Sequence, residues 1–136
     1  MESISENINR ADASYTFRLV IESLNRRGGQ VRTAKILQEY QGEYFLHYKN
    51  YCCLLESKTV KSLLNLLANI DVSIPPLPGG GFDGIDYKLT IGGHVNSLVF
   101  SWWTDQINEN WQPLIELREA VYNLCRKNFQ LAADEI

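Results

Sequence analysis

Residues 79–103 read GGGFDGIDYKLTIGGHVNSLVFSWW, and this stretch decides between two kinds of fold. Its first six residues match the G-x-G-x-x-G pattern of a dinucleotide-binding loop, which works only where a strand ends and a helix begins. Here the glycines follow a proline-rich run and lead into residues whose apolar side chains alternate, as in a strand. We therefore expect a loop followed by a β-hairpin, with no bound nucleotide or other cofactor.

The hairpin is indicated by Gly92–Gly93, a pair typical of tight turns. Apolar residues alternate along both of its arms: Ile85, Tyr87, Leu89 and Ile91 before the turn, and Leu98, Phe100 and Trp102 after it. Trp103 directly follows Trp102, and consecutive residues of a strand point to opposite faces of the sheet. Trp103 is therefore expected on the other face, with Val99 and Ser101.

Three more strands are expected upstream, because a period of two begins at Tyr15. We predict strands over 15–22, 30–40 and 43–55, and short connections favour antiparallel neighbours in a meander. The third strand is expected to show Tyr44, Leu46 and Tyr48 on one face and Phe45, His47 and Tyr51 on the other.

Two helices follow from the change to a period of 3.6. The first is expected from Ser57 to about Asn69, before the prolines at 75, 76 and 78, and carries Val60, Leu63, Leu64 and Leu67 on one face. The second begins between Asn110 and Pro113, and its apolar stripe is Leu114, Leu117, Val121 and Leu124.

The expected order is βββ-α-ββ-α, an α+β fold in which an antiparallel sheet of about five strands carries the helices on one face. Residues 14–136 are expected to form a single domain. Residues 1–13, in which Ile4 and Ile8 lie at helical spacing, are expected to be a flexible arm or one short helix. The predicted core consists of Phe17, Leu19, Ile21, Leu63, Leu64, Leu67, Leu89, Ile91, Phe100, Leu117 and Val121.

The composition limits the classes of partner that can be expected. The 136 residues carry a formal net charge of −3, whereas a nucleic-acid partner demands a basic footprint, so nucleic acid is not expected. No apolar run approaches the roughly 20 residues that cross a bilayer, and the first residues lack the pattern of a signal peptide. Three cysteines, two of them adjacent, form no disulfide framework. We expect a cytoplasmic protein with no membrane partner.

The two histidines and three cysteines are the candidate catalytic and metal-binding residues. None has the spacing of a metal site or a nucleophile motif, so we expect no catalytic residue, no metal and no enzyme activity. One alternative stays open: a small hydrolase or ligand-binding domain with a pocket under the 76–84 loop. That alternative requires Cys53, His47 or His94 to meet a carboxylate within about 3 Å.

Aromatic residues on the sheet face without helices favour a protein partner, because Trp and Tyr are frequent anchors of interfaces. Cover by the 71–84 loop is the alternative. We predict a contact surface made of Trp103 and Tyr51 with Asp83, Asp86 and Asp105 around them. Negative charge steers a protein towards a basic partner, so a basic protein is expected.

Residues 82–125 resemble the end of several families of small bacterial proteins, some of them immunity proteins encoded beside secreted toxins. The resemblance lies in a D-G-x-x-Y strand, a hairpin that ends in Trp and a W-x-P-L-x-x-L helix, here Asp83, Gly84, Tyr87, Trp103, Trp111, Pro113, Leu114 and Leu117. It implies a non-enzymatic inhibitor that covers a toxin. The element order also resembles that of small acidic secretion chaperones, which implies a homodimeric binder as the alternative.

Overall fold

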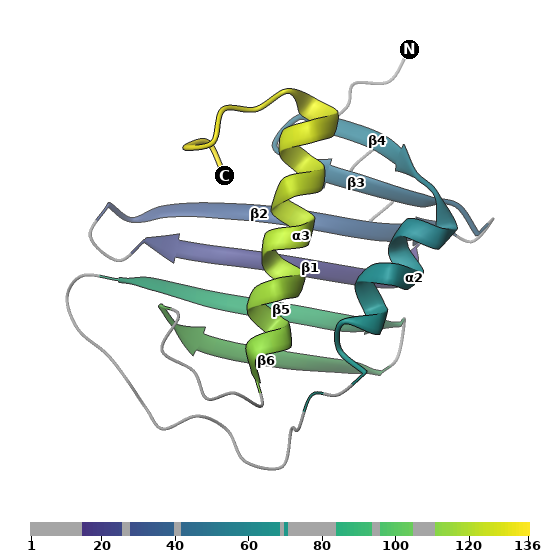
Figure 1. The fold of residues 1–136 in the computed structure, drawn as a ribbon, viewed down its shortest axis with the longest axis horizontal. Coiled ribbons are helices and arrows are strands. Elements are labelled where there is room, and N and C mark those ends of the chain that lie inside the picture. The colour runs from purple at the N-terminus through teal and green to yellow at the C-terminus, as the bar shows by residue number, and fades with distance from the viewer. Residues whose placement is uncertain are drawn as a thin grey trace.

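The computed structural model describes residues 15–25, 28–39, 42–68, 70, 84–93, 96–104 and 111–136. These residues form six strands and two helices (Figure 1). The elements are β1 (Tyr15–Asn25), β2 (Gln30–Glu39), β3 (Tyr44–Tyr48), β4 (Tyr51–Leu55), α2 (Ser57–Asn65), β5 (Ile85–Gly93), β6 (Ser97–Trp103) and α3 (Gln112–Phe129). The predicted α+β class is confirmed. Residues 1–13, for which an arm or short helix was predicted, lie outside the described residues.

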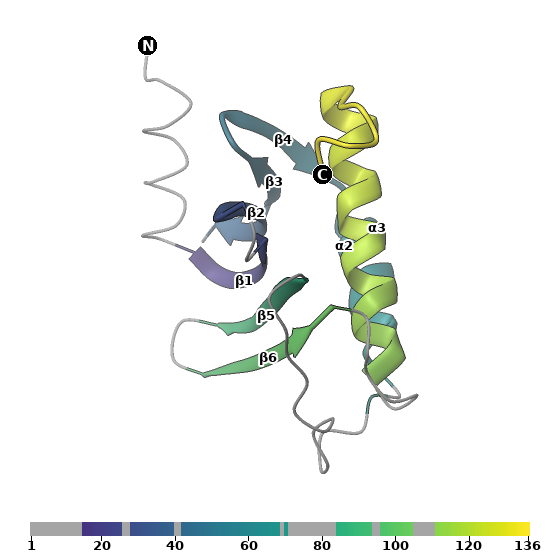
Figure 2. The same cartoon turned by 90° about the vertical axis from the view of Figure 1, so that its left-hand side faces the viewer.

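All six strands belong to one antiparallel sheet with the order β4-β3-β2-β1-β5-β6. The predicted meander begins at β1 and runs through β2 and β3 to the edge strand β4, and the β5–β6 hairpin pairs with the other side of β1. Both helices lie on the same side of the sheet, and α3 crosses the strands (Figures 1 and 2). We call this side the helix-covered face and the other side the second face.

The predicted third strand, 43–55, is in fact two strands joined by a tight turn at Lys49 and Asn50. Lys49 takes a left-handed backbone conformation, with a φ of 52°. Because the turn reverses the chain, Tyr51 pairs with Tyr48 and points to the same face as Tyr48. The prediction that Tyr51 shares a face with Phe45 and His47 was therefore wrong, and the sheet has six strands where about five were expected.

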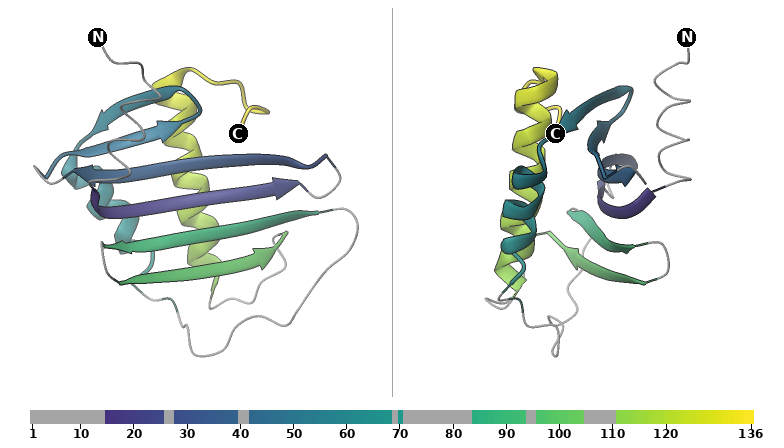
Figure 3. Two further views of the ribbon diagram at one scale, coloured as in Figure 1. Left: turned by 180° about the vertical axis from the view of Figure 1, so that it is seen from behind. Right: turned by 90° about the vertical axis from the view of Figure 1, so that its right-hand side faces the viewer.

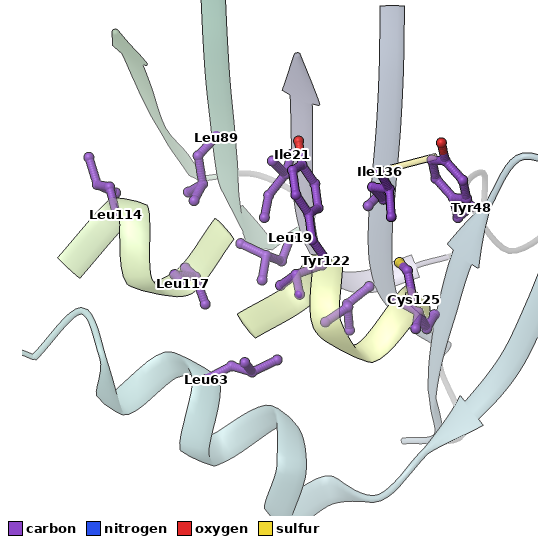
Figure 4. Close-up of a cluster of buried hydrophobic side chains, with 14 of the residues drawn as sticks. Leu19, Ile21, Tyr48, Leu63, Leu89, Leu114, Leu117, Tyr122, Cys125 and Ile136 are labelled. Carbon is purple, nitrogen blue, oxygen red and sulfur yellow. The ribbon is translucent and has the colours of Figure 1, made fainter. Parts of the chain in front are cut away.

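The hydrophobic core lies between the helices and the helix-covered face (Figure 4). Of the predicted core residues, those buried are Leu19, Ile21, Leu63, Leu89, Phe100, Leu117 and Val121, and those partly buried against them are Phe17, Leu64, Leu67 and Ile91. Pro113 lies in the first turn of α3, where its missing N–H costs no hydrogen bond. The start predicted for this helix is confirmed.

The last residues of the chain add to the core in a way that no periodicity predicted. After α3 the chain turns back at Gln130, which has a left-handed φ of 53°. The side chain of Ile136 is buried in the core, and the Tyr48 hydroxyl donates to the Glu135 carbonyl at 2.7 Å. The Arg126 guanidinium donates to the backbone oxygen of Ile136. This segment therefore closes the helix-covered face beside β2 and β3.

Candidate contact surface

The register of the sheet arranges the side chains of the second face in rows. Figure 3 (left) shows the strands from this side of the sheet. One row runs Val31, Leu24, Asp86 and Trp103, from β2 to the edge strand β6. A second row runs Cys52, His47, Lys35, Val20, Thr90 and Val99, across all six strands. These rows show which of the predicted site residues can act together.

Trp103 lies on the second face, opposite Asp86 of β5. Trp102 points the other way and is buried, with its ring stacked on Tyr87 at 5.4 Å between centroids. The predicted split of the two tryptophans between the faces is therefore confirmed. Trp103 itself is half-buried. It thus has area left for a partner while the domain already holds its ring in place.

Gly84 lies directly against the Trp103 ring. A side chain on Gly84 would place its Cβ 2.4 Å from the indole nitrogen of Trp103, and the φ of Gly84 is 152°. Next to this contact the Thr104 N–H donates to the Ile85 carbonyl at 2.6 Å, which closes the end of the β5–β6 hairpin. The glycine is therefore required by a close approach, and the ring orientation depends on it.

Replacing Gly84 with Ala is expected to displace the Trp103 ring and to lower the free energy of unfolding by about 1 to 3 kcal/mol, because the added methyl group overlaps the indole. Tryptophan emission should shift to the red and the melting temperature should fall. Gly29→Ala is the control, since Gly29 also has a positive φ but nothing within 4 Å of its Cβ position. Equal emission spectra for the two variants would contradict the contact.

Of the other predicted contact residues, Asp86 lies next to Trp103 on the second face. Tyr51 lies on β4, at the opposite edge, on the helix-covered face, with its ring stacked on Phe129 at 5.2 Å. Five strand spacings, or about 24 Å, separate β4 from β6. The structure therefore brings Asp86 and Trp103 together but not Tyr51. Asp83 and Asp105 lie outside the described residues.

The edge strand β6 exposes apolar side chains that the predicted site did not include. Leu98 and Val99 are 59% and 53% exposed, on the two faces of the strand. The strand sequence, SLVFSWW, has no charged residue, and within the described part of the chain no strand pairs with its outer edge. We define the β6 surface as Asp86, Leu98, Val99 and Trp103. An uncharged edge of this kind is a template for further strand pairing.

Two segments whose charged residues are all acidic join the described chain at one end of the β6 surface. The segments 71–83 and 105–110 together carry Asp71, Asp83, Asp105 and Glu109 and no Lys or Arg. They join the described chain at Gly84 and Thr104, which the hydrogen bond between Thr104 and Ile85 holds side by side. The sequence analysis predicted Asp83, Asp86 and Asp105 around Trp103, and of these Asp86 is the one that the structure describes, opposite Trp103.

A buried arginine was missed by the sequence analysis. Arg118 of α3 is 3% exposed, its guanidinium carbon lies 4.2 Å from the centroid of the Tyr87 ring, and its Nη2 lies 2.8 Å from the Glu119 carboxylate. Tyr122 is buried one turn further along α3, and burial is the main reason that its pKa is raised. The available signal was a charge four residues after Leu114, within the apolar stripe. These contacts indicate that Arg118 stabilises the packing of α3 against the sheet.

The residues named for the enzyme alternative are separated by the sheet. Cys53 pairs with Leu46 on the helix-covered face, whereas His47 is buried on the second face, where its cross-strand neighbours are Cys52 and Lys35. Cys53 and His47 therefore cannot share a cleft. His94 and the loop residues 76–83 lie outside the described residues. Among the described residues, no three metal-ligating side chains gather, and neither helix is long and apolar enough to cross a membrane.

Burial raises the pKa of the Cys125 thiol to about 12. Since the unfolded thiol titrates near 8.5, the folded protein favours the neutral thiol, and this stability is present below that pH and lost as pH rises towards 12. We expect the free energy of unfolding to fall between pH 9 and 11, with Cys125 contributing up to about 1 kcal/mol per pH unit. Urea unfolding of Cys125→Ala at several pH values should show a smaller fall of the unfolding free energy per pH unit. An unchanged slope would contradict the assignment.

No protein-family model matches this chain, and no curated protein matches it either. The resemblance of residues 82–125 to bacterial immunity proteins therefore remains a prediction.

Proposed function

We propose that this protein is a non-enzymatic, cytoplasmic protein-binding domain that covers a basic surface of another protein with its β6 surface. The observation that carries the proposal is the meeting of two features at one corner of the sheet. Exposed apolar side chains lie along an uncharged edge strand, and two segments that carry only negative charge join the chain beside Trp103.

Each feature has its own part in binding. The edge of β6 presents backbone donors and acceptors for an added strand or loop, and Val99 and Trp103 supply apolar contact area. The acidic segments accelerate association with a basic surface more than they increase affinity. The sequence between β1 and β2 carries Arg26 and Arg27. A positive charge apart from the acidic segments would help to fix the orientation of the partner.

The partner class that fits this surface is a basic protein, and the expected role is that of an inhibitor such as an immunity protein. A toxin that acts on nucleic acid is a basic protein of this kind, because its substrate is a polyanion. If a reading frame beside the gene encodes a basic secreted protein, that protein would be the first partner to test.

The experiment is affinity capture from the native cell with the tagged full chain, compared between wild type, Val99→Arg and Leu54→Arg. Val99 and Leu54 are 53% and 59% exposed, and both lie on the second face of an edge strand, at opposite edges of the sheet. We expect Val99→Arg to lose the partner and Leu54→Arg to keep it, with elution at raised salt. Capture by both variants, or by neither, would contradict the proposal.

A homodimer is the second candidate, because the uncharged edge of β6 can also pair with the same edge of another copy. We rank it second since each copy would bring its own acidic segments to the interface, and like charges repel. Sedimentation velocity distinguishes the two candidates. A dimer that Val99→Arg dissociates would favour the homodimer, and a monomer would favour a different partner.

A further inference from the structure

The segment that follows α3 is bound through its backbone by side chains from three different elements. The donors lie on β2, β3 and α3, and the acceptors are three consecutive backbone oxygens. In order, the hydrogen bonds run from Arg32 Nη2 to the Asp134 oxygen at 3.2 Å, from the Tyr48 hydroxyl to the Glu135 oxygen at 2.7 Å, and from Arg126 Nη2 to the Ile136 oxygen. Donors that contact the backbone of a peptide bind it whatever its side chains are, and apolar contacts then supply the specificity.

Ile136 is the apolar anchor of this segment. Its side chain is 5% exposed and belongs to the same core cluster as Tyr48, whereas residues 132–135 are exposed and Leu131 is partly buried (Figure 4). Within the described part of the chain, no backbone hydrogen bond joins residues 131–136 to a strand. A segment held by so few contacts opens at a lower free-energy cost than that of global unfolding.

The charges of the segment and of the side chains around it are opposite. Arg32 and Arg126 bind its backbone, and the Lys49 ammonium lies 5.5 Å from the centroid of the Tyr48 ring. Residues 131–136 read LAADEI, with two carboxylates and no cation. We call these six residues the strap, and we define the strap site as Arg32, Tyr48, Arg126 and the core side chains around Ile136. Opposite charges favour a peptide of this acidic kind over a basic one.

We propose that the strap site is a peptide-binding site, which the strap occupies within its own chain and which takes an acidic segment of a partner protein when the strap leaves. The partner segment carries an aliphatic residue in the place of Ile136. The three donors bind the backbone of any segment that takes the same turn, and the core side chains select the aliphatic residue.

The strap competes with such a partner because it is tethered beside the site. A short tether gives an effective concentration of about a millimolar, so a free peptide binds weakly until the strap is released. The strap site lies on the helix-covered face beside β2 and β3, whereas the β6 surface lies at the far edge of the sheet. The inference therefore goes beyond the proposed function and does not depend on it.

Fluorescence anisotropy of a labelled peptide, measured with the full chain, tests this. Ile136→Gly removes the anchor, so this variant should bind the peptide LAADEI at least about tenfold more tightly than wild type does. Ala133→Gly is the matched control, because it makes the backbone equally flexible at an exposed position of the strap, and it should bind like wild type. Ile136→Gly should bind the peptide LAADEG at least about tenfold more weakly than LAADEI, because LAADEG lacks the aliphatic side chain. It should also bind LAAKKI more weakly at low salt.

Four results would overturn the proposal. They are no binding of LAADEI to Ile136→Gly, equal binding of LAADEI and LAADEG, equal binding of LAADEI to wild type and Ile136→Gly, and a wild-type dimer that Ile136→Gly dissociates. The third would mean that the peptide binds elsewhere, and the fourth that the site takes the strap of a second copy. Ile136→Ala replaces Ile136→Gly should the latter fail to fold. Adding Val99→Arg should leave LAADEI binding unchanged, which separates this test from that of the β6 surface.

Discussion

Replacing Val121 with Asp is expected to abolish folding at room temperature. Val121 lies on α3 and is fully buried among the apolar side chains of the helix-covered face. Burying a carboxylate among these apolar side chains costs several kcal/mol, against a total stability of about 5 to 15 kcal/mol for a domain of this size. Circular dichroism should show loss of the cooperative melting transition.

The control for this variant is Asn123→Asp. Asn123 is exposed on the same helix, and its side-chain oxygen accepts from Arg126, which an Asp oxygen can also do. It should melt like wild type. Wild-type melting of Val121→Asp would mean that α3 presents a different face to the sheet. Val121 is fully buried, whereas Leu64 is only partly buried. Leu64→Asp should therefore destabilise the domain less than Val121→Asp.

Replacing Arg118 with Ala is expected to lower the free energy of unfolding by about 2 to 4 kcal/mol, because it opens a cavity between α3 and the Tyr87 ring. Most of this loss should come from packing, since the side chain of Glu119 is 46% exposed and water can solvate its carboxylate. Arg118→Met keeps the length of the side chain and removes its charge. It should therefore recover at least half of the loss in urea unfolding.

Two outcomes would contradict this role. If Arg118→Ala changes the unfolding free energy by less than about 0.5 kcal/mol, the arginine is not packed as described. If Arg118→Met is as unstable as Arg118→Ala, the charge of Arg118 holds the helix and packing does not.

The fold class, the β5–β6 hairpin and the start of α3 could be predicted because each depends on a local pattern. The turn at Lys49 and Asn50 could not, because neither residue is the glycine that usually marks a left-handed turn position. That one turn divided a strand and reversed the face assigned to Tyr51. Arg118 was missed because only apolar residues were counted along its stripe. Ile136 was missed because a single apolar residue has no period.

The candidate site shows the same division. Trp103 and Asp86 meet because they are partners in a hairpin whose turn the sequence indicates clearly. Tyr51 does not meet them, because the turn at Lys49 and Asn50 that sets its face has no local signal in the sequence. Asp83 and Asp105, which were also predicted around Trp103, lie outside the described residues.

Hydrogen exchange of the protein with its captured partner tests the central claim most directly, namely that the β6 surface is where a partner binds. In the free protein the outward amides of an edge strand lack sheet partners and exchange quickly. We predict that binding slows exchange along Ser97–Trp103 and leaves Tyr51–Leu55, the strand at the opposite edge, unchanged. Protection of Tyr51–Leu55 with no change along Ser97–Trp103 would contradict the account.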